Sequence, residues 1–145
     1  MSKVLERLQS LPIFLDFSDK DWRGLDLLWD IRHVAEDEIL WLQGDLASEL
    51  AFLLDGALSV QINGQSLATV PKNELVGELA VFTQDVRSAS ISAETDCELL
   101  ILSSENFEIM RDSHPKVYDC LLDVSLTRLA IRIQAMNRRI ARTSA

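Results

Sequence analysis

The sequence contains only two cysteines and two histidines, and it has no long apolar run. Cys97 and Cys120 stand far apart without a CxxC motif, which argues against a structural zinc site and favours two reduced, largely buried thiols. The apolar stretches, such as residues 51–54 and 99–102, are far too short to cross a bilayer. The start of the chain has no signal-peptide pattern. These absences predict a cytoplasmic protein without membrane insertion.

The sequence also lacks enzyme signatures and an overall basic charge. None of the GxSxG, HExxH and GxxxxGK motifs occurs, so we expect no enzyme and no metal or other cofactor. The net charge of −9 argues against a nucleic-acid binder. The charge is uneven, because the C-terminal end contains no acid and five arginines: Arg128, Arg132, Arg138, Arg139 and Arg142. Such a basic end can meet an acidic partner or the protein's own surface, and the second is commoner for a helix face.

With 145 residues, the chain has the size of one domain with a single core. We expect N-terminal helices in residues 1–29, strands in residues 30–102 and C-terminal helices in residues 103–142. Helical spacing of apolar residues predicts a first helix over residues 3–9, which Pro12 ends. Ser18 is a suitable N-cap for a second helix over residues 21–28.

The middle of the chain has the alternation that is typical of antiparallel strands. Leu58, Val60 and Ile62 alternate with polar residues, and the same pattern recurs around Ile91. Asn63-Gly64 lies between two alternating runs and predicts a hairpin, and Gln43-Gly44-Asp45 marks another turn. Short strands at this spacing predict a mainly β fold, a sandwich or barrel, with flanking helices.

Two helices are predicted after the strands. Ser103 or Ser104 can cap the first, which ends near Arg111, and Pro115 suits the first turn of a long helix that runs to about Arg142. An apolar stripe with coiled-coil spacing follows the long helix: Leu122, Leu126, Leu129, Ile133, Met136 and Ile140. The stripe can pack on the protein's own strands. Because an earlier apolar face already serves that purpose, we expect it to form a homodimer instead.

One segment has the residue types of an anion site. Gly77 lets the backbone approach a ligand closely, and residues 78–82 can form a helical turn with free N–H groups at its start. Arg87, predicted to open an alternating strand, would place a guanidinium opposite those groups and clamp one phosphate. Glu78 beside a phosphate would be repulsive unless its carboxylate accepts a hydrogen bond from a sugar hydroxyl.

Gly77-Glu78-Leu79-Ala80 and Arg87-Ser88-Ala89-Ser90 resemble the phosphate-binding cassette of the cyclic nucleotide-binding domain family. This family includes catabolite activator proteins, regulatory subunits of cAMP-dependent kinase and cyclic-nucleotide-gated channels. The resemblance extends over about residues 10–135. It implies a double-stranded β-helix (a jelly-roll or β-roll) with N-terminal helices and a long C-terminal helix.

The sequence departs from the family pattern at three positions. Asp37 and Asn73 stand where the family usually has glycine, and Val86 replaces a proline. Asn and Asp tolerate a left-handed backbone best among the other residues, so we expect both turns to survive. None of the three departures removes a charge that would bind the nucleotide.

The resemblance also implies roles for individual residues. Glu78 would accept a hydrogen bond from the ribose 2′-OH, and Arg87 would pair with the phosphate oxygens. The Ser88 hydroxyl and three backbone N–H groups would complete the phosphate cradle, those of Leu79, Ala80 and Ala89, and Gly77 would let the backbone approach the ligand. Ser88 resembles the serine of bacterial cAMP receptors, which favours cAMP over cGMP as the ligand. Arg132 stands near the family's lid residues, although a solvated helix arginine is the commoner interpretation.

Two functional hypotheses remain at this point. In the first, the domain is a sensor that passes ligand binding to a partner through its last helix. In the second, it is a structural interaction module with the same fold and an empty or occluded pocket. Separately, Arg87 could pair with Asp85 or Glu94 and contact no ligand. A DNA-binding regulator has no support, because the sequence ends at Ala145, where the family's transcription factors continue into a helix-turn-helix.

Overall fold

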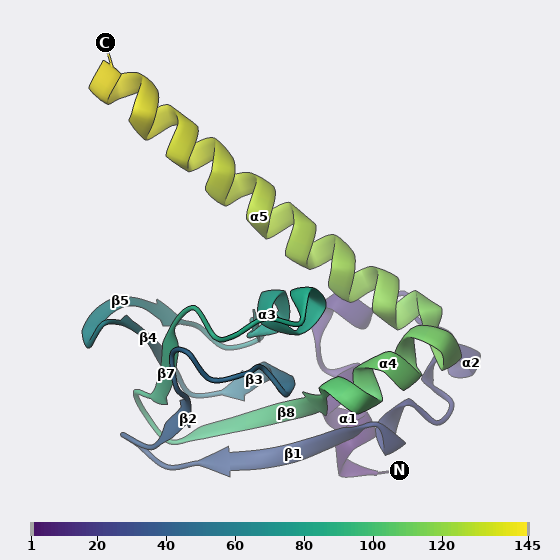
Figure 1. The fold of residues 1–145 in the computed structure, drawn as a ribbon. Coiled ribbons are helices and arrows are strands. Elements are labelled where there is room, and N and C mark those ends of the chain that lie inside the picture. Colours follow the sequence, from purple (N-terminus) through teal and green to yellow (C-terminus); the bar gives the residue numbers. More distant parts are fainter. Residues whose placement is uncertain (1, 145) are drawn as a thin grey trace.

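The computed structural model describes residues 2–144, and the side chains of residues 2–142. It is a β-roll with short helices at its N-terminal side and two longer helices after it (Figure 1). The mainly β fold class with flanking helices is therefore confirmed. The N-terminal elements are α1 (Lys3–Gln9), η1 (Pro12–Phe14), α2 (Asp19–Trp22) and η2 (Leu25–Leu27).

The helix predicted over residues 21–28 is wrong in its extent. Ser18 begins α2 as expected, and its backbone N–H donates to the Asp21 carboxylate over 2.8 Å. The helix ends at Trp22, because Gly24 has a φ of 75°. That left-handed residue turns the chain into the separate 3₁₀ turn η2.

Within residues 2–144, eight strands form two antiparallel four-stranded sheets. The first sheet has the order β1-β8-β3-β6 and the second the order β2-β7-β4-β5. Their bounds are β1 (Trp29–Val34), β2 (Ile39–Trp41), β3 (Glu49–Asp55), β4 (Leu58–Ile62), β5 (Gln65–Val70), β6 (Leu75–Val76), β7 (Ser90–Ala93) and β8 (Cys97–Ser103).

Turns with a left-handed backbone join these strands. The predicted hairpin is confirmed: β4 pairs with β5, and Asn63 and Gly64 between them have φ values of 52° and 80°. Asp37 and Asn73, the two replacements for glycine, have φ values of 69° and 73°. Both turns therefore survive the loss of glycine, as expected from the tolerance of Asn and Asp.

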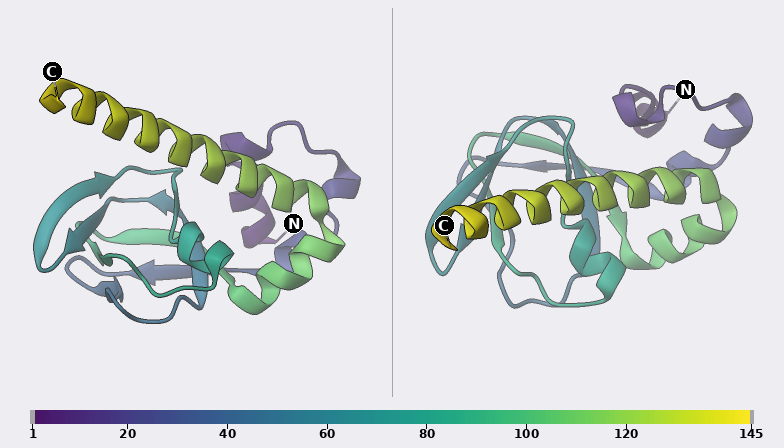
Figure 2. Two further views of the ribbon diagram at one scale, coloured as in Figure 1. Left: turned by 45° about the horizontal axis from the view of Figure 1, so that its top comes forward. Right: turned by 90° about the horizontal axis from the view of Figure 1, so that it is seen from above.

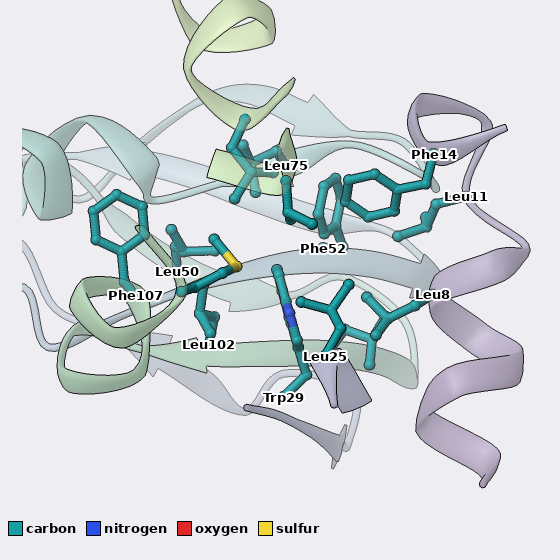
Figure 3. Close-up of a cluster of buried hydrophobic side chains, with 14 of the residues drawn as sticks. Leu8, Leu11, Phe14, Leu25, Trp29, Leu50, Phe52, Leu75, Leu102 and Phe107 are labelled. Carbon is teal, nitrogen blue, oxygen red and sulfur yellow. The ribbon is translucent and has the colours of Figure 1, made fainter. Parts of the chain in front are cut away.

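The first sheet is covered on both faces, which explains the apolar runs in β3 and β8. Leu50, Phe52 and Leu54 of β3 pack with the N-terminal and C-terminal helices (Figure 3). Ala51 and Leu53, on the opposite face, pack against the second sheet inside the roll. A strand buried on both faces reads as a continuous apolar run rather than as an alternation.

The two helices after the roll are α4 (Ser104–Ser113) and α5 (Pro115–Ser144). Ser103 caps α4, and its hydroxyl accepts from the Asn106 N–H over 3.1 Å. The first turns of α5 bury Val117, Leu121 and Ser125 against the body of the domain. The helix then passes over the roll, and its C-terminal half runs away from it (Figures 1 and 2). Within residues 2–144, no helix is long and apolar enough to cross a membrane.

Candidate functional site

A cavity lies between the roll, the short helix α3 (Glu78–Thr83) and α5. All seven predicted site residues line it: Gly77, Glu78, Leu79, Ala80, Arg87, Ser88 and Ala89. Arg132 lines it as well, from α5, although its side chain is largely exposed. Three further polar or aromatic residues line the cavity without any indication from the sequence motif: Trp41, Glu74 and Arg128. The structure thus brings the predicted residues together and adds a second group to them.

Gly77 forms the corner between β6 and α3, and no other residue fits there. Its φ of 75° is in the left-handed region. A Cβ atom at this position would lie 2.4 Å from Nη1 of Arg87 and 2.5 Å from the indole ring of Trp41. The N–H groups in the first turn of α3 have no partner within the helix. Glycine therefore allows the backbone to bend and keeps the arginine and the indole close to it.

Arg87 does not open a strand, which corrects the sequence prediction. Strand β7 begins at Ser90, and Arg87 lies before it, outside any regular element. Its backbone N–H donates to the Asp45 carbonyl over 2.7 Å, and its carbonyl accepts from the Gly44 N–H over 2.8 Å. The predicted turn at residues 43–45 therefore provides the backbone hydrogen-bond partners of Arg87, which a neighbouring strand would otherwise provide.

The Arg87 side chain is only 5% exposed, and backbone carbonyls and an aromatic ring surround it. Nη1 donates to the Gly77 carbonyl over 2.9 Å, and Nη2 donates to the Glu49 carbonyl. Cζ lies 3.7 Å from the centre of the Trp41 ring. Burial lowers the pKa of Arg87, while the negative charges of Glu49 and Glu78 oppose this shift.

No carboxylate among residues 2–142 forms an ion pair with Arg87. The suggested partners are engaged elsewhere: the Asp85 carboxylate accepts from the Val86 N–H, and that of Glu94 accepts from the Thr69 hydroxyl. The hypothesis that Arg87 pairs with Asp85 or Glu94 is therefore wrong. The buried guanidinium faces the cavity without a counter-ion.

Glu78 has a different environment from Arg87, because an arginine of α5 reaches it. Its side chain is largely buried, and its Oε1 lies 3.4 Å from Nη1 of Arg128. The same Nη1 donates to the Leu75 carbonyl over 2.6 Å, and Nη2 pairs with the Glu74 carboxylate. Arg128 thus ties α5 to the segment that carries Glu78.

A chain of polar contacts lies behind Arg87. The indole Nε1–H of Trp41 donates to the Glu49 carboxylate over 3.0 Å. Both oxygens of that carboxylate accept from Arg32, over 2.5 Å and 3.0 Å. Burial alone would raise the pKa of Glu49, but the hydrogen bonds from Arg32 and Trp41 and the charges of Arg32 and Arg87 hold it below its ordinary value. Three strands contribute to this chain, so no short motif could indicate it.

Comparisons with known proteins identify the family of this chain. The family model described as "Cyclic nucleotide-binding domain" matches residues 31–114. The human potassium/sodium hyperpolarization-activated cyclic nucleotide-gated channel 4 is 29% identical over 87 residues, which are 60% of this chain and 7% of the channel. A cyclic nucleotide-gated potassium channel of Rhizobium etli is 27% identical over 97 residues, which are 67% of this chain and 27% of that protein. The match thus spans only a small part of these curated relatives.

Solved structures show the same fold over most of the chain. A cyclic nucleotide-binding domain from Methylobacillus flagellatus is similar with a TM-score of 0.75 and 26% identity, covering 94% of this chain and 80% of the other. The catabolite activator protein of Thermus thermophilus gives a TM-score of 0.74 and 26% identity, covering 87% of this chain and 62% of the other. The family model matches residues 31–114, which are more than half of this chain. The chain therefore belongs to the cyclic nucleotide-binding domain family.

Proposed function

We propose that this domain binds a cyclic nucleotide in the cavity beside α3, with cAMP preferred over cGMP, and passes the binding to α5. One observation carries the proposal: the buried guanidinium of Arg87 lines a cavity without a carboxylate partner. A buried charge without a counter-ion is costly, whereas a bound anion would stabilise it. The role is regulatory rather than catalytic, and we expect the domain to act in the cytoplasm.

The charge of the site fits a cyclic phosphate. A cyclic phosphodiester has one negative charge, which matches one guanidinium, and the first-turn N–H groups of α3 offer further donors. Leu79, Ala80, Ser88 and Ala89 line the same cavity. Gly77 leaves room for a close approach of the ligand. We therefore assign the phosphate to Arg87, with these residues around it.

Glu78 is suited to bind the sugar beside this phosphate. A carboxylate near a phosphate would repel it, but Arg128 offsets the charge of Glu78 across 3.4 Å. A carboxylate has several acceptor positions, so the remaining ones can accept from a ribose hydroxyl. This arrangement requires a nucleotide with a free 2′-OH, which both cAMP and cGMP have. The preference for cAMP is based on Ser88, which resembles the serine of bacterial cAMP receptors.

Arg128 also supports a route from the ligand to the long helix. It belongs to α5 and contacts Glu74, Leu75 and Glu78 around the cavity. A ligand that binds Glu78 changes the surroundings of Arg128 and thereby the preferred position of α5. The free energy for such a shift is limited to the difference in ligand affinity between the two positions.

The apolar stripe on α5 supports a homodimer as the receiving partner. Its members beyond Leu122 are exposed, from 37% for Leu129 to 59% for Ile140. This exposure contradicts packing of the stripe on the protein's own strands. Replacing Leu129 and Ile133 with lysine should convert a dimer to a monomer in sedimentation equilibrium. A wild-type monomer at all concentrations would refute the dimer and leave the nucleotide site unaffected.

Thermal unfolding with added ligand tests the binding itself. A ligand that binds only the folded state raises the melting temperature, so cAMP should raise it more than cGMP, and adenosine should have little effect. The alternative, a structural module with an empty cavity, predicts no shift with any of the three. Direct titration by calorimetry then gives the affinity and the stoichiometry.

A further inference from the structure

We propose that Trp41 is a positioning residue of the phosphate end of the cavity: its indole face supports the Arg87 guanidinium and leaves the charge of Arg87 available to the ligand. This inference rests on the proposed nucleotide binding and adds a residue from a different part of the sequence to it. Trp41 lies on β2, far from residues 77–89 in the chain.

The indole of Trp41 contacts both parts of the site that would meet a phosphate. Cζ of Arg87 stacks 3.7 Å from the ring centre. The backbone of Gly77 comes so close to the same ring that a Cβ there would lie 2.5 Å from it. Two edge nitrogens of the guanidinium donate to the carbonyls of Gly77 and Glu49. The ring therefore covers one face of the guanidinium, while two carbonyls fix part of its edge.

The indole is itself held in place from behind. Its Nε1–H donates to the Glu49 carboxylate over 3.0 Å, and Arg32 grips that carboxylate with two hydrogen bonds. Trp41 is 9% exposed and packs in the apolar cluster between the two sheets of the roll. Three strands thus fix the ring before any ligand arrives. A fixed ring means that Arg87 need not be ordered at the moment of binding.

A neutral support has a consequence that a carboxylate support would not have. A carboxylate in contact with Arg87 would take its remaining N–H donors and neutralise its charge. The face of an indole attracts a cation through its quadrupole and accepts no hydrogen bond from the guanidinium edge. Glu49 offers Arg87 its backbone carbonyl, while its carboxylate accepts hydrogen bonds from Trp41 and Arg32. Arg87 is therefore stabilised without an ion pair.

Two substitutions of Trp41 test this role by calorimetric titration with cAMP. Trp41→Leu keeps an apolar side chain but removes the aromatic face, and should weaken binding about tenfold. Trp41→Phe keeps a smaller aromatic face and should fall between Trp41→Leu and the wild type. Trp22 provides a matched control, because it is 8% exposed but packs in the other apolar cluster, between the first sheet and the helices. Trp22→Leu should lower the melting temperature and leave the affinity unchanged.

A double-mutant cycle separates positioning from general destabilisation. If Trp41 acts through Arg87, then Trp41→Leu has almost no further effect in an Arg87→Ala background, with both affinities measured by NMR titration up to millimolar cAMP. An equal loss in both backgrounds, or an unchanged affinity of Trp41→Leu, would overturn the inference and leave the proposed function standing. If the wild type binds neither cAMP nor cGMP, the proposed function fails, and this inference fails with it.

Discussion

The cavity has a largely buried charged residue at each end, and the two charges are stabilised in different ways. At one end, Arg87 contacts two carbonyls and the Trp41 ring, and forms no ion pair with any carboxylate within residues 2–142. At the other end, Glu78 has a cationic neighbour, Arg128, which also pairs with Glu74. Residues of the roll and the corner at Gly77 hold Arg87, whereas a residue of α5 balances Glu78, which is the first residue of α3.

This difference assigns separate tasks to the two ends. The Arg87 end has several fixed contacts and a charge that no direct ion pair within residues 2–142 neutralises, which are the properties that an anion site needs. The charge at the Glu78 end is balanced by Arg128 of α5, a helix whose buried side chains (Val117, Leu121 and Ser125) lie in its first turns, ahead of Arg128. We therefore expect substitutions at the first end to change the affinity for nucleotide most strongly. Substitutions at the second end should change the coupling between ligand and α5.

The largest effect is expected from Gly77→Ala. A Cβ at φ 75° is strained, and it would collide with both Arg87 and Trp41. We expect the free energy of unfolding to fall by about 2–4 kcal/mol and cAMP binding to be lost, as measured by urea denaturation and calorimetry. Gly64→Ala is the matched control: its φ is 80° and no atom lies within 4 Å of its Cβ position. Equal losses of stability in the two variants would show that the crowding at Gly77 is unimportant.

Arg87→Ala comes next. It should weaken cAMP binding by at least about tenfold, because charge-assisted hydrogen bonds to the phosphate contribute roughly 1.5–3 kcal/mol each. The stability of the unliganded protein should change much less, since removing a buried cation offsets the loss of two hydrogen bonds to carbonyls. Calorimetry and thermal unfolding measure the two quantities. A large loss of stability with an unchanged affinity would assign Arg87 a structural role instead.

Arg128→Ala should have a smaller effect on affinity, at the opposite end. It leaves Glu78 without its cation, and a partly exposed ion pair contributes about 1 kcal/mol, so we expect a three- to fivefold loss in calorimetry. Without ligand, the amide hydrogens of α5 should also exchange faster in this variant than in the wild type, because the contacts of Arg128 with Leu75 and Glu74 are lost. Arg138→Ala, an exposed arginine on the same helix, serves as the control. The same loss in both variants would point to the overall charge of the helix.

The smallest effect is expected from Glu49→Gln, on the free energy of unfolding, and this effect should depend on pH. The pKa of Glu49 is held below its ordinary value of 4.5, so its carboxylate stabilises the fold above that value. This contribution is lost as the pH falls through the lowered pKa. We expect Glu49→Gln to cost up to about 1 kcal/mol at neutral pH and the difference from the wild type to vanish in strong acid. Urea denaturation across this range measures it, with Glu94→Gln as a control. A difference that persists in acid would contradict the account.

The local part of the site was predictable from the sequence, and the long-range part was not. Gly77, Glu78 and Arg87 belong to one short segment with a turn residue, an acid and a base in a recognisable order. Trp41 and Arg128 come from a different strand and from the last helix, and each looks ordinary in its own segment. Only the folded chain shows that the ring of Trp41 lies under Arg87 and that Arg128 reaches Glu78.

The errors in the predicted elements have similar causes. The alternation from Ala89 to Ala93 correctly indicates a strand, but its start at Arg87 was wrong, because the turn at residues 43–45 takes the backbone groups of Arg87. The helix predicted over residues 21–28 ends early, because Gly24 adopts a left-handed backbone. In both places, the apolar pattern gives the kind of element, and a contact or a single residue sets its bounds.

The central claim is that the Arg87 guanidinium binds the phosphate of the ligand. The most direct test is the ¹H–¹⁵N resonance of the Arg87 Nε–H group, assigned with the help of Arg87→Ala, during titration with cAMP and with adenosine. Because only cAMP carries the phosphate, the account predicts a shift that saturates with cAMP and little change with adenosine. Saturable binding of cAMP that leaves this resonance unmoved would contradict the account.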